Sequence, residues 1–196
     1  MVATHRVLLD YISERSSTSL AQDEISQIET VFVPRKFKKR QYFLQQGEVC
    51  NRGGFIVRGA MRQYSVDEKG AEHIAELMVE NWWIGDVVSM FTGAPSSFYI
   101  DAWEDTDVLV ASVEDFARMR SIPAFAQMAK SMIEGHTVAI HHRAHDALTL
   151  SAEQRYERLL QSHPEFLQRF PQHFVASYLG VTPETVSRIR RLLTRR

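Results

Sequence analysis

The chain has 196 residues, 44% of them hydrophobic, with 23 Lys and Arg against 24 Asp and Glu. This apolar content excludes an intrinsically disordered chain, and 9 Gly and 6 Pro are too few for a collagenous or low-complexity one. A single cysteine, Cys50, excludes a disulfide framework, and the lack of a signal peptide or a membrane-spanning run leads us to expect a folded cytoplasmic protein.

Two helices are predicted at the N-terminus, over residues 4–15 and 21–30, from their apolar spacing. Between residues 31 and 113, short runs rich in Val, Ile, Phe, Tyr and Trp are separated by turn residues, for example at 52–54 and 67–70. Strands at roughly 8–12-residue spacing with turns between them predict an antiparallel sandwich or a small barrel.

The pattern becomes helical again from about residue 112 and continues to about Ala147, with Pro123 as a start or kink. A helix of about 25 residues is roughly 37 Å long, which is more than a small β domain needs for its own core. It either packs along its own domain or forms a dimer seam, and its near-heptad spacing favours the seam. The residues assigned to this seam are Phe125, Met128, Met132, His136 and Ala139.

The C-terminal segment differs from the rest in charge. From Ala147 onward there are eight Arg and four Glu, net +4, which leaves the first 146 residues with 15 basic and 20 acidic residues, net −5. Ser151 with Gln154 three positions later predicts a capped helix start. A basic segment on an acidic body is typical of a protein that meets a polyanion.

The strongest motif is QHFVASYLGVTPETVSRIRR at residues 172–191. A helix-turn-helix needs a small residue where its helices cross, a glycine at the turn and apolar inner faces. The residues predicted to meet these needs are Val175, Ala176, Leu179, Gly180, Val181, Val186 and Ile189. Thr182 is a good N-cap for the second helix, and Pro183 suits its first position.

The outer face of that second helix carries the candidate DNA-reading residues. Arg188 can offer two donors to guanine, and Glu184 can accept a hydrogen bond from cytosine or orient Arg188. The candidate contacts to the DNA backbone are Thr182, Thr185, Ser187, Arg190, Arg191 and Arg195.

The order of motifs resembles the Crp/Fnr family of bacterial transcription regulators. It is carried by GEVCNRGGFIVRGAMRQY, DEKG and WWIGD, then a long helix, then ETVSRIRR. The chain looks most like the short regulators of this family found in Bacteroidetes-type bacteria. The resemblance implies an α+β fold with a cyclic-nucleotide-binding-like jelly roll at 1–115, a dimerisation helix at 116–147 and a helix-turn-helix domain at 148–196. It also implies a homodimer that reads a pseudo-palindromic site on double-stranded DNA, with RNA polymerase as a further partner.

Two departures from the family pattern matter. Gly85-Asp86 resembles the Gly-acidic pair of members that bind cyclic AMP, but Ser96 stands where their phosphate-clamping Arg is expected. An unpaired phosphate would be costly to desolvate, so we do not expect cyclic AMP to bind. The chain also stops at Arg196, soon after the recognition helix, so we expect no C-terminal β-hairpin wing.

We call residues 85–100, which contain Gly85-Asp86 and Ser96, the cassette. Aromatic residues gather around it, and they form either a filled core or an apolar effector pocket. The candidate pocket residues are Trp83, Gly85, Asp86, Met90, Phe91, Ser96, Ser97 and Phe98. An effector, if the protein has one, is a small molecule that the sequence does not identify.

Four histidines crowd the long helix: His136, His141, His142 and His145. His141 and His145 have the i,i+4 spacing of a metal-chelating pair, but no third ligand completes a site, so we expect no metal and no cofactor. The β region contains a single histidine, which argues against a cupin-type enzyme, and no spacing supports a haem site. We assign no catalytic residue. The alternative from a different class is a ligand- or metal-binding sensor module whose basic tail contacts a protein.

Overall fold

The computed structural model describes residues 2–193, with side chains from residue 4 onward. The chain divides into two compact units. The first unit contains the chain up to Gln63 together with Met78–Gly135, and the second contains Tyr64–Leu77 together with the chain from His136 onward. The domain boundaries at residues 115 and 147 stay a prediction.

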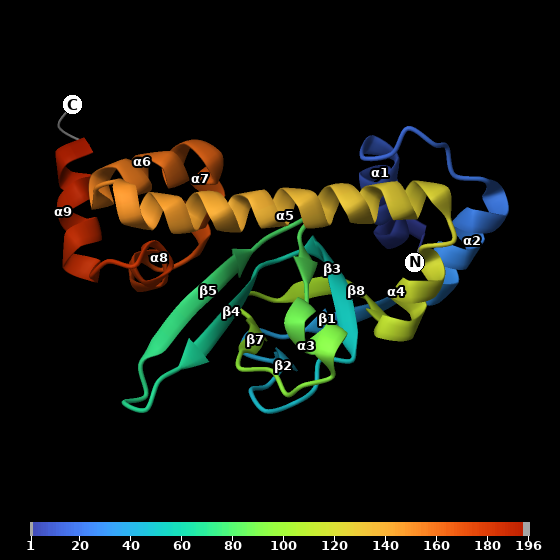
Figure 1. Ribbon diagram of the computed structural model, residues 1–196, viewed down its shortest axis with the longest axis horizontal. Coiled ribbons are helices and arrows are strands. Elements are labelled where there is room, and N and C mark those ends of the chain that lie inside the picture. Colours follow the sequence, from blue (N-terminus) through green and yellow to red (C-terminus); the bar gives the residue numbers. More distant parts are fainter. Residues whose placement is uncertain (1, 194–196) are drawn as a thin grey trace. The chain divides into compact units, whose positions relative to one another are not determined.

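The described helices and strands follow the predicted order along the chain (Figure 1). The helices are α1 (Val2–Glu14), α2 (Gln22–Val31), α3 (Val87–Thr92), α4 (Val113–Met119), α5 (Pro123–Thr149), α6 (Ala152–Ser162), α7 (Pro164–Arg169), α8 (Gln172–Leu179) and α9 (Pro183–Leu193). The strands are β1 (Val33–Phe37), β2 (Tyr42–Leu44), β3 (Arg52–Arg58), β4 (Met61–Val66), β5 (Glu72–Met78), β6 (Trp83–Ile84), β7 (Tyr99–Ala102) and β8 (Thr106–Ser112).

The strands form two four-stranded sheets, in the orders β1-β8-β3-β6 and β2-β7-β4-β5. Pairing is antiparallel between β1 and β8, β2 and β7, β3 and β6, and β3 and β8. Gly54 of β3 faces Val110 of β8, and a Cβ added at Gly54 would stand 2.6 Å from Val108 Cγ1, so only glycine fits there. The predicted antiparallel jelly roll, followed by a long helix, is confirmed.

The hydrophobic core of the first unit has two parts. One part lies between the sheets and contains Phe43, Ile56, Met61, Ile100 and Val108. The other joins the N-terminal helices to the start of α5 and contains Leu8, Ile12, Ile28, Phe32, Phe55, Phe125 and Met128. The predicted N-terminal helices therefore serve to cover the β structure.

The structure differs from the sequence prediction at the short helix α3 and agrees with it at Pro123. Helix α3 lies within a run that reads as strand-like, and it begins because Asp86 accepts hydrogen bonds from the backbone N–H groups of Val88 and Ser89. The helical pattern from about residue 112 is divided into α4 and α5, and α5 begins at Pro123, where proline suits a first helical turn.

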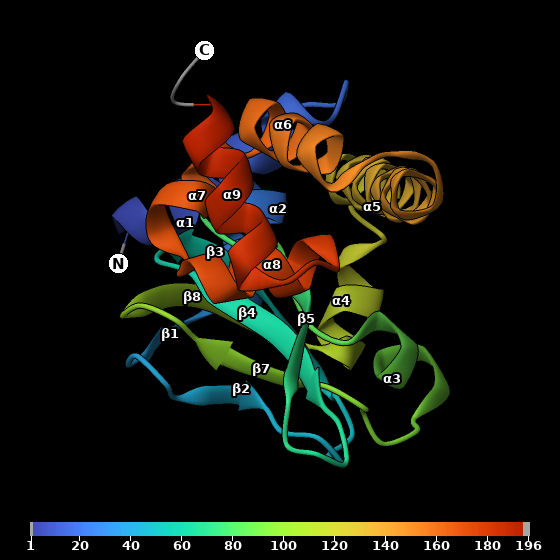
Figure 2. The same cartoon turned by 90° about the vertical axis from the view of Figure 1, so that its left-hand side faces the viewer.

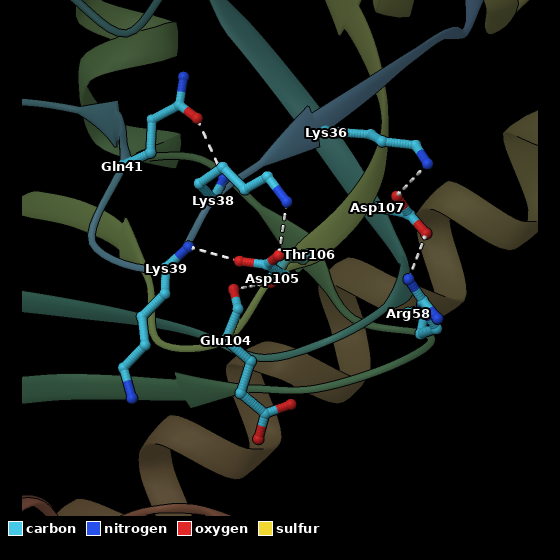
Figure 3. Close-up of polar contacts among 9 residues, drawn as sticks. All are labelled: Lys36, Lys38, Lys39, Gln41, Arg58, Glu104, Asp105, Thr106 and Asp107. Carbon is cyan, nitrogen blue, oxygen red and sulfur yellow. Dashed lines mark hydrogen bonds and ion pairs between the residues drawn. The ribbon is translucent and has the colours of Figure 1, made fainter.

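The turn between β1 and β2 is held by Asp105, the residue that precedes β8 (Figure 3). Asp105 accepts hydrogen bonds from Lys38 Nζ at 2.7 Å and from the Lys39 backbone N–H at 3.0 Å. The hydrogen bond from Lys38 lowers the pKa of Asp105, and that of Lys38 is raised in turn. Because the pKa of Asp105 is lowered on folding, this contribution to stability is present at neutral pH and is lost as the pH falls through that lowered value.

In the second unit, two contacts set the start of α6. Ser151 caps the helix by accepting a hydrogen bond from the Gln154 backbone N–H, and the Gln154 side chain accepts one from the Ser151 N–H. Arg158 of α6 then reaches back to Asp146 near the end of α5, with Nη1 2.5 and 2.6 Å from its two carboxylate oxygens. Asp146 is buried, so this pair ties α6 to α5.

Candidate nucleic-acid interface

Helices α8 and α9 are joined by a tight turn at Gly180. Gly180 ends α8 with φ +66° and ψ 38°, in the left-handed region that favours glycine. The Val181 N–H donates to the Ala176 carbonyl at 2.9 Å, and Arg155 of α6 donates to the Leu179 carbonyl at 2.6 Å. These bonds satisfy carbonyl groups that the end of a helix leaves open.

Helices α8 and α9 pack against each other and against α6 (Figure 2). Tyr156 of α6, Ala176, Val186 and Ile189 form the centre of this core, and the Ala176 side chain is fully buried. Of the residues predicted for packing, Val175, Ala176, Val186 and Ile189 are buried, Leu179 and Val181 are half-buried, and Gly180 forms the turn. The small residue therefore lies in the helix-packing core, as a close crossing requires.

The N-terminus of α9 is capped by Thr182, whose hydroxyl accepts a hydrogen bond from the Thr185 N–H at 3.3 Å. Glu184, in the first turn, has its pKa lowered by its own backbone N–H and then by the Thr182 hydroxyl. The Glu184 carboxylate therefore stays ionised at neutral pH and can act only as a hydrogen-bond acceptor.

Glu184 and Arg188 lie on the outer face of α9. At about 100° per residue, Glu184, Ser187, Arg188 and Arg191 fall within roughly 100° of one another, opposite Val186 and Ile189. Both Glu184 and Arg188 are exposed, and no ion pair joins them. Arg188 has no hydrogen bond or ion pair to any of the described residues, and it lines a groove of about 250 Å³ with Ser151 and Glu153. In this structure, Glu184 therefore does not orient Arg188 through a direct contact.

The candidate backbone contacts are placed as follows. Thr182, Arg190 and Arg191 are exposed, Thr185 and Ser187 are half-buried, and Arg195 lies outside the described residues. The Thr182 hydroxyl is already engaged in capping α9, so a phosphate would compete with the Thr185 N–H for it.

The polar groups of the cassette around α3 are hydrogen-bonded to one another and to the neighbouring backbone. Asp86 is buried, and one carboxylate oxygen caps α3 while the other accepts a hydrogen bond from Ser96 Oγ at 2.7 Å. Ser89 Oγ donates to the Ala94 carbonyl at 2.6 Å and accepts from the Cys50 N–H at 2.9 Å. Ser96 is uncharged, so it cannot neutralise the charge of a phosphate. Its hydroxyl is already hydrogen-bonded to the Asp86 carboxylate.

Arg62, the last arginine before this segment in the sequence, is already paired. Arg62 donates to both carboxylate oxygens of Asp101, at 2.8 and 3.0 Å, and both side chains are buried. A bidentate buried pair of this kind is strongly destabilised when one partner is withdrawn. The residues present do not fit a cyclic nucleotide phosphate.

The remaining candidate pocket residues do not line one space. Met90 lies close to Gly85, where an added Cβ would meet its Cε at 3.2 Å. The Trp83 ring packs among Tyr11, Phe32, Phe55, Phe116 and Phe125, whereas Phe91 is 71% exposed, Ser97 is exposed and Phe98 is half-buried. The groove of about 720 Å³ in this unit lies elsewhere, between α2 and α4. An effector pocket at these residues stays a prediction.

The predicted dimer seam needs correction at two residues. Phe125 and Met128 are buried in the core of their own unit, so they are not available to a second chain. Met132 is half-buried, and His136 and Ala139 are exposed. The large apolar side chains that α5 leaves exposed are Ile133, Val138, Ile140 and Leu148, with exposed fractions of 44%, 53%, 43% and 88%.

The histidines of α5 form no metal site in the part of the chain that is described. No group of three or more His, Cys, Asp or Glu side chains converges there. His141, His142 and His145 are exposed, and His136 Nε2 lies 3.4 Å from the carboxylate of Glu76. Among residues 2–193, no helix has both the length and the apolar character needed to cross a membrane.

Sequence reasoning missed the contacts between β5 and the helices of the second unit. Arg143 donates to the Ala75 carbonyl at 2.7 Å, and Ser177 Oγ accepts from the Ile74 N–H at 2.9 Å. No local pattern signals them, because the residues that meet are 68 and 103 positions apart in the chain.

Residues 34–122 match the model of the cyclic nucleotide-binding domain family. No curated protein matches the chain significantly. Among solved structures, the chain is similar to the c-di-GMP-responsive global regulator CLP of Xanthomonas campestris, with a TM-score of 0.69, 13% identity, and coverage of 89% of this chain and 92% of that one. For FixK2 from Bradyrhizobium japonicum the TM-score is 0.65 and the identity 21%, over 84% of this chain and 85% of that one.

A Crp/Fnr-family regulator from Eubacterium rectale is also similar, with a TM-score of 0.64 and 15% identity, over 89% of this chain and 84% of that one. At these identities the likeness establishes the fold. The β region thus matches the cyclic nucleotide-binding domain family over residues 34–122, and the chain has the fold of solved Crp/Fnr regulators, in agreement with the resemblance of its motifs.

Proposed function

We propose that this protein is a sequence-specific, DNA-binding transcription regulator of the Crp/Fnr type, which acts in the cytoplasm as a homodimer on a pseudo-palindromic site. RNA polymerase is a further partner if the regulator activates transcription. We assign it no catalytic activity and no resident cofactor, and we expect that cyclic AMP does not control it.

The outer face of α9 is the observation that supports DNA binding. It presents an ionised acceptor, Glu184, and an exposed Arg188 that no described residue engages. Their inner-face neighbours Val186 and Ile189 are buried, so the helix is held by a core while its outer face is open. A helix supported in this way can enter the major groove, where a guanidinium reads guanine and a carboxylate reads cytosine.

DNA binding predicts a strong dependence on salt. Neutralising phosphates releases counterions, so affinity for a random duplex should fall at least tenfold between about 50 and 200 mM salt. Fluorescence anisotropy with a labelled random duplex measures this, and selection of bound fragments from genomic DNA then finds the operator. If the duplex shows no salt-dependent binding, the chain is instead a sensor module whose basic tail contacts a protein.

Cyclic AMP and cyclic GMP are expected not to bind in the micromolar range. The Asp86 carboxylate is taken up by Ser96 and by α3, and Arg62 is held by Asp101, so a phosphate entering the cassette would be desolvated without a fixed cation. Isothermal titration calorimetry should give only the heat of dilution for both nucleotides.

Saturable heat with one nucleotide per chain would contradict this expectation. Repeating the titration with Arg62→Gln and with Lys69→Gln would then identify the cation that binds the phosphate, because only the variant that lacks it should lose the heat.

A further inference from the structure

Most of the hairpin of β4 and β5, residues 64–77, belongs to the second unit. Residues 64–77 form one compact body with the second half of α5 and with α6–α9, although they are far from these helices in sequence. Strand β5 is the last in its sheet, so one side of its backbone has no partner strand. Such an edge strand is open to docking by another element.

Helix α8 uses this open edge. Ser177 Oγ accepts a hydrogen bond from the Ile74 N–H at 2.9 Å and donates one to the Glu72 carbonyl at 3.4 Å. One hydroxyl therefore engages the two backbone groups that flank His73 on the strand edge, as a neighbouring strand would.

Arg143 of α5 makes a second connection. Its Nη1 donates to the Ala75 carbonyl at 2.7 Å, and its guanidinium lies 4.9 Å from the ring centroid of Tyr178 on α8. The side chain therefore contacts the strand and the helix at once. Next to it on β5, Glu76 is only 21% exposed and faces His136. We call these contacts of Ser177 and Arg143 the hairpin latch.

The docked hairpin is acidic. Residues 64–77 contain Asp67, Glu68, Glu72 and Glu76 against the single Lys69. The helices it contacts belong to the basic end of the chain, where Arg exceeds Glu by eight to four from Ala147 onward. A negatively charged segment held on α8 raises the free energy of bringing DNA phosphates to the same helices.

We propose that the β4–β5 hairpin is an autoinhibitory arm, whose latch to α8 lowers the DNA affinity of the α8–α9 motif. This inference rests on the proposed DNA binding. Strand β4 begins in the first unit, where its Arg62 is bound to Asp101, and continues into the hairpin. A conformational change in the β domain can therefore reach the latch along this strand.

Releasing the latch should raise DNA affinity. Ser177→Ala and Arg143→Gln should each increase affinity for a random duplex about two- to tenfold, the range that one net hydrogen bond sustains. Ser162→Ala is the matched control, because Ser162 is an exposed helical serine that bonds only within α6, and it should leave the affinity unchanged. Equal or weaker binding by both latch variants would overturn the proposal.

Hydrogen exchange gives an independent readout on the wild-type protein. The Ile74 amide is hydrogen-bonded by Ser177 and should exchange faster in Ser177→Ala. Adding saturating duplex to the wild type should also speed its exchange, since the arm must leave when DNA binds. Slower exchange with duplex would mean that the latch persists on DNA, and the proposal would fail.

The test separates this inference from the proposed function. If neither wild type nor either latch variant binds duplex at low salt, DNA binding itself is wrong. If the wild type binds with a salt dependence and the latch variants bind no better, DNA binding stands and the autoinhibitory arm is rejected. A triple variant, Asp67→Asn, Glu68→Gln and Glu72→Gln, should raise affinity more at low than at high salt, because its effect is electrostatic.

Discussion

Replacing Ile140 by Glu should convert the protein from a dimer to a monomer. Ile133 and Ile140 are exposed on α5 one heptad apart, and Ala126 and Ala147 extend the same row by one heptad in each direction. A row of this kind is what a second helix buries in a coiled-coil seam. In the dimer, each Glu would be a buried charge without a partner, which costs several kcal/mol.

Sedimentation equilibrium measures the result directly. The wild type should give about twice the chain mass of 22.6 kDa at micromolar concentration, and Ile140→Glu should give the mass of one chain. DNA affinity for a two-half-site duplex should fall about 10²- to 10⁴-fold, because the second half-site is then no longer bound intramolecularly.

Val138→Glu is the control for this prediction. Val138 is also exposed, at 53%, but it lies two residues before Ile140 and therefore about 200° away around the helix. It should leave the dimer intact. A monomeric wild type, or dissociation by Val138→Glu with retention of the dimer by Ile140→Glu, would show that this row is not the seam.

The predicted seam also shows where sequence periodicity stops being informative. Phe125 and Met128 have the spacing of a seam, yet they pack against the core that α1 and α2 complete. Periodicity identifies an apolar face of a helix but does not say which neighbour covers it. That choice depends on contacts between distant segments, here with Leu8 and Ile28.

The C-terminal motif was easier to predict because its signals are local. Gly180 at a left-handed turn, Thr182 at the helix N-cap and Ser151 with Gln154 each act over a few residues. The same kind of signal was present at α3, where Asp86 caps the helix and Gly93 ends it in the left-handed region. The Val and Phe residues between these two positions are typical of a strand, and they favour a strand over the helix that the caps indicate.

The polar pairing inside the cassette and the hairpin latch could not have been predicted in this way. The sequence shows that Ser96 stands where the family pattern has an arginine. The hydrogen bond from Ser96 to Asp86 depends on the fold of the loop after α3 and has no local signal. Ser177 reads as an ordinary polar residue on a helix, and only the position of the β5 edge gives it a partner.

Arg188→Ala is expected to weaken binding to the cognate site by about 1–3 kcal/mol, or roughly 5- to 150-fold, and to relax preference at one base position in each half-site. The reason is geometric. Arg188 lies one helical turn after Glu184 on the outer face of α9, it is exposed, and no described residue engages its guanidinium, so two of its N–H donors are free for a guanine.

Glu184→Gln should alter base preference at a neighbouring position, because the amide that replaces the carboxylate presents a donor as well as an acceptor. Arg191→Ala and Arg195→Ala serve as backbone controls and should weaken all duplexes about equally, each lowering the salt slope by about one phosphate per chain. The measurement is anisotropy on the cognate duplex, on single-base variants of it and on random DNA, at two salt concentrations. Equal loss on cognate and random DNA for Arg188→Ala would identify Arg188 as a phosphate contact, and α9 would then not read bases through this residue.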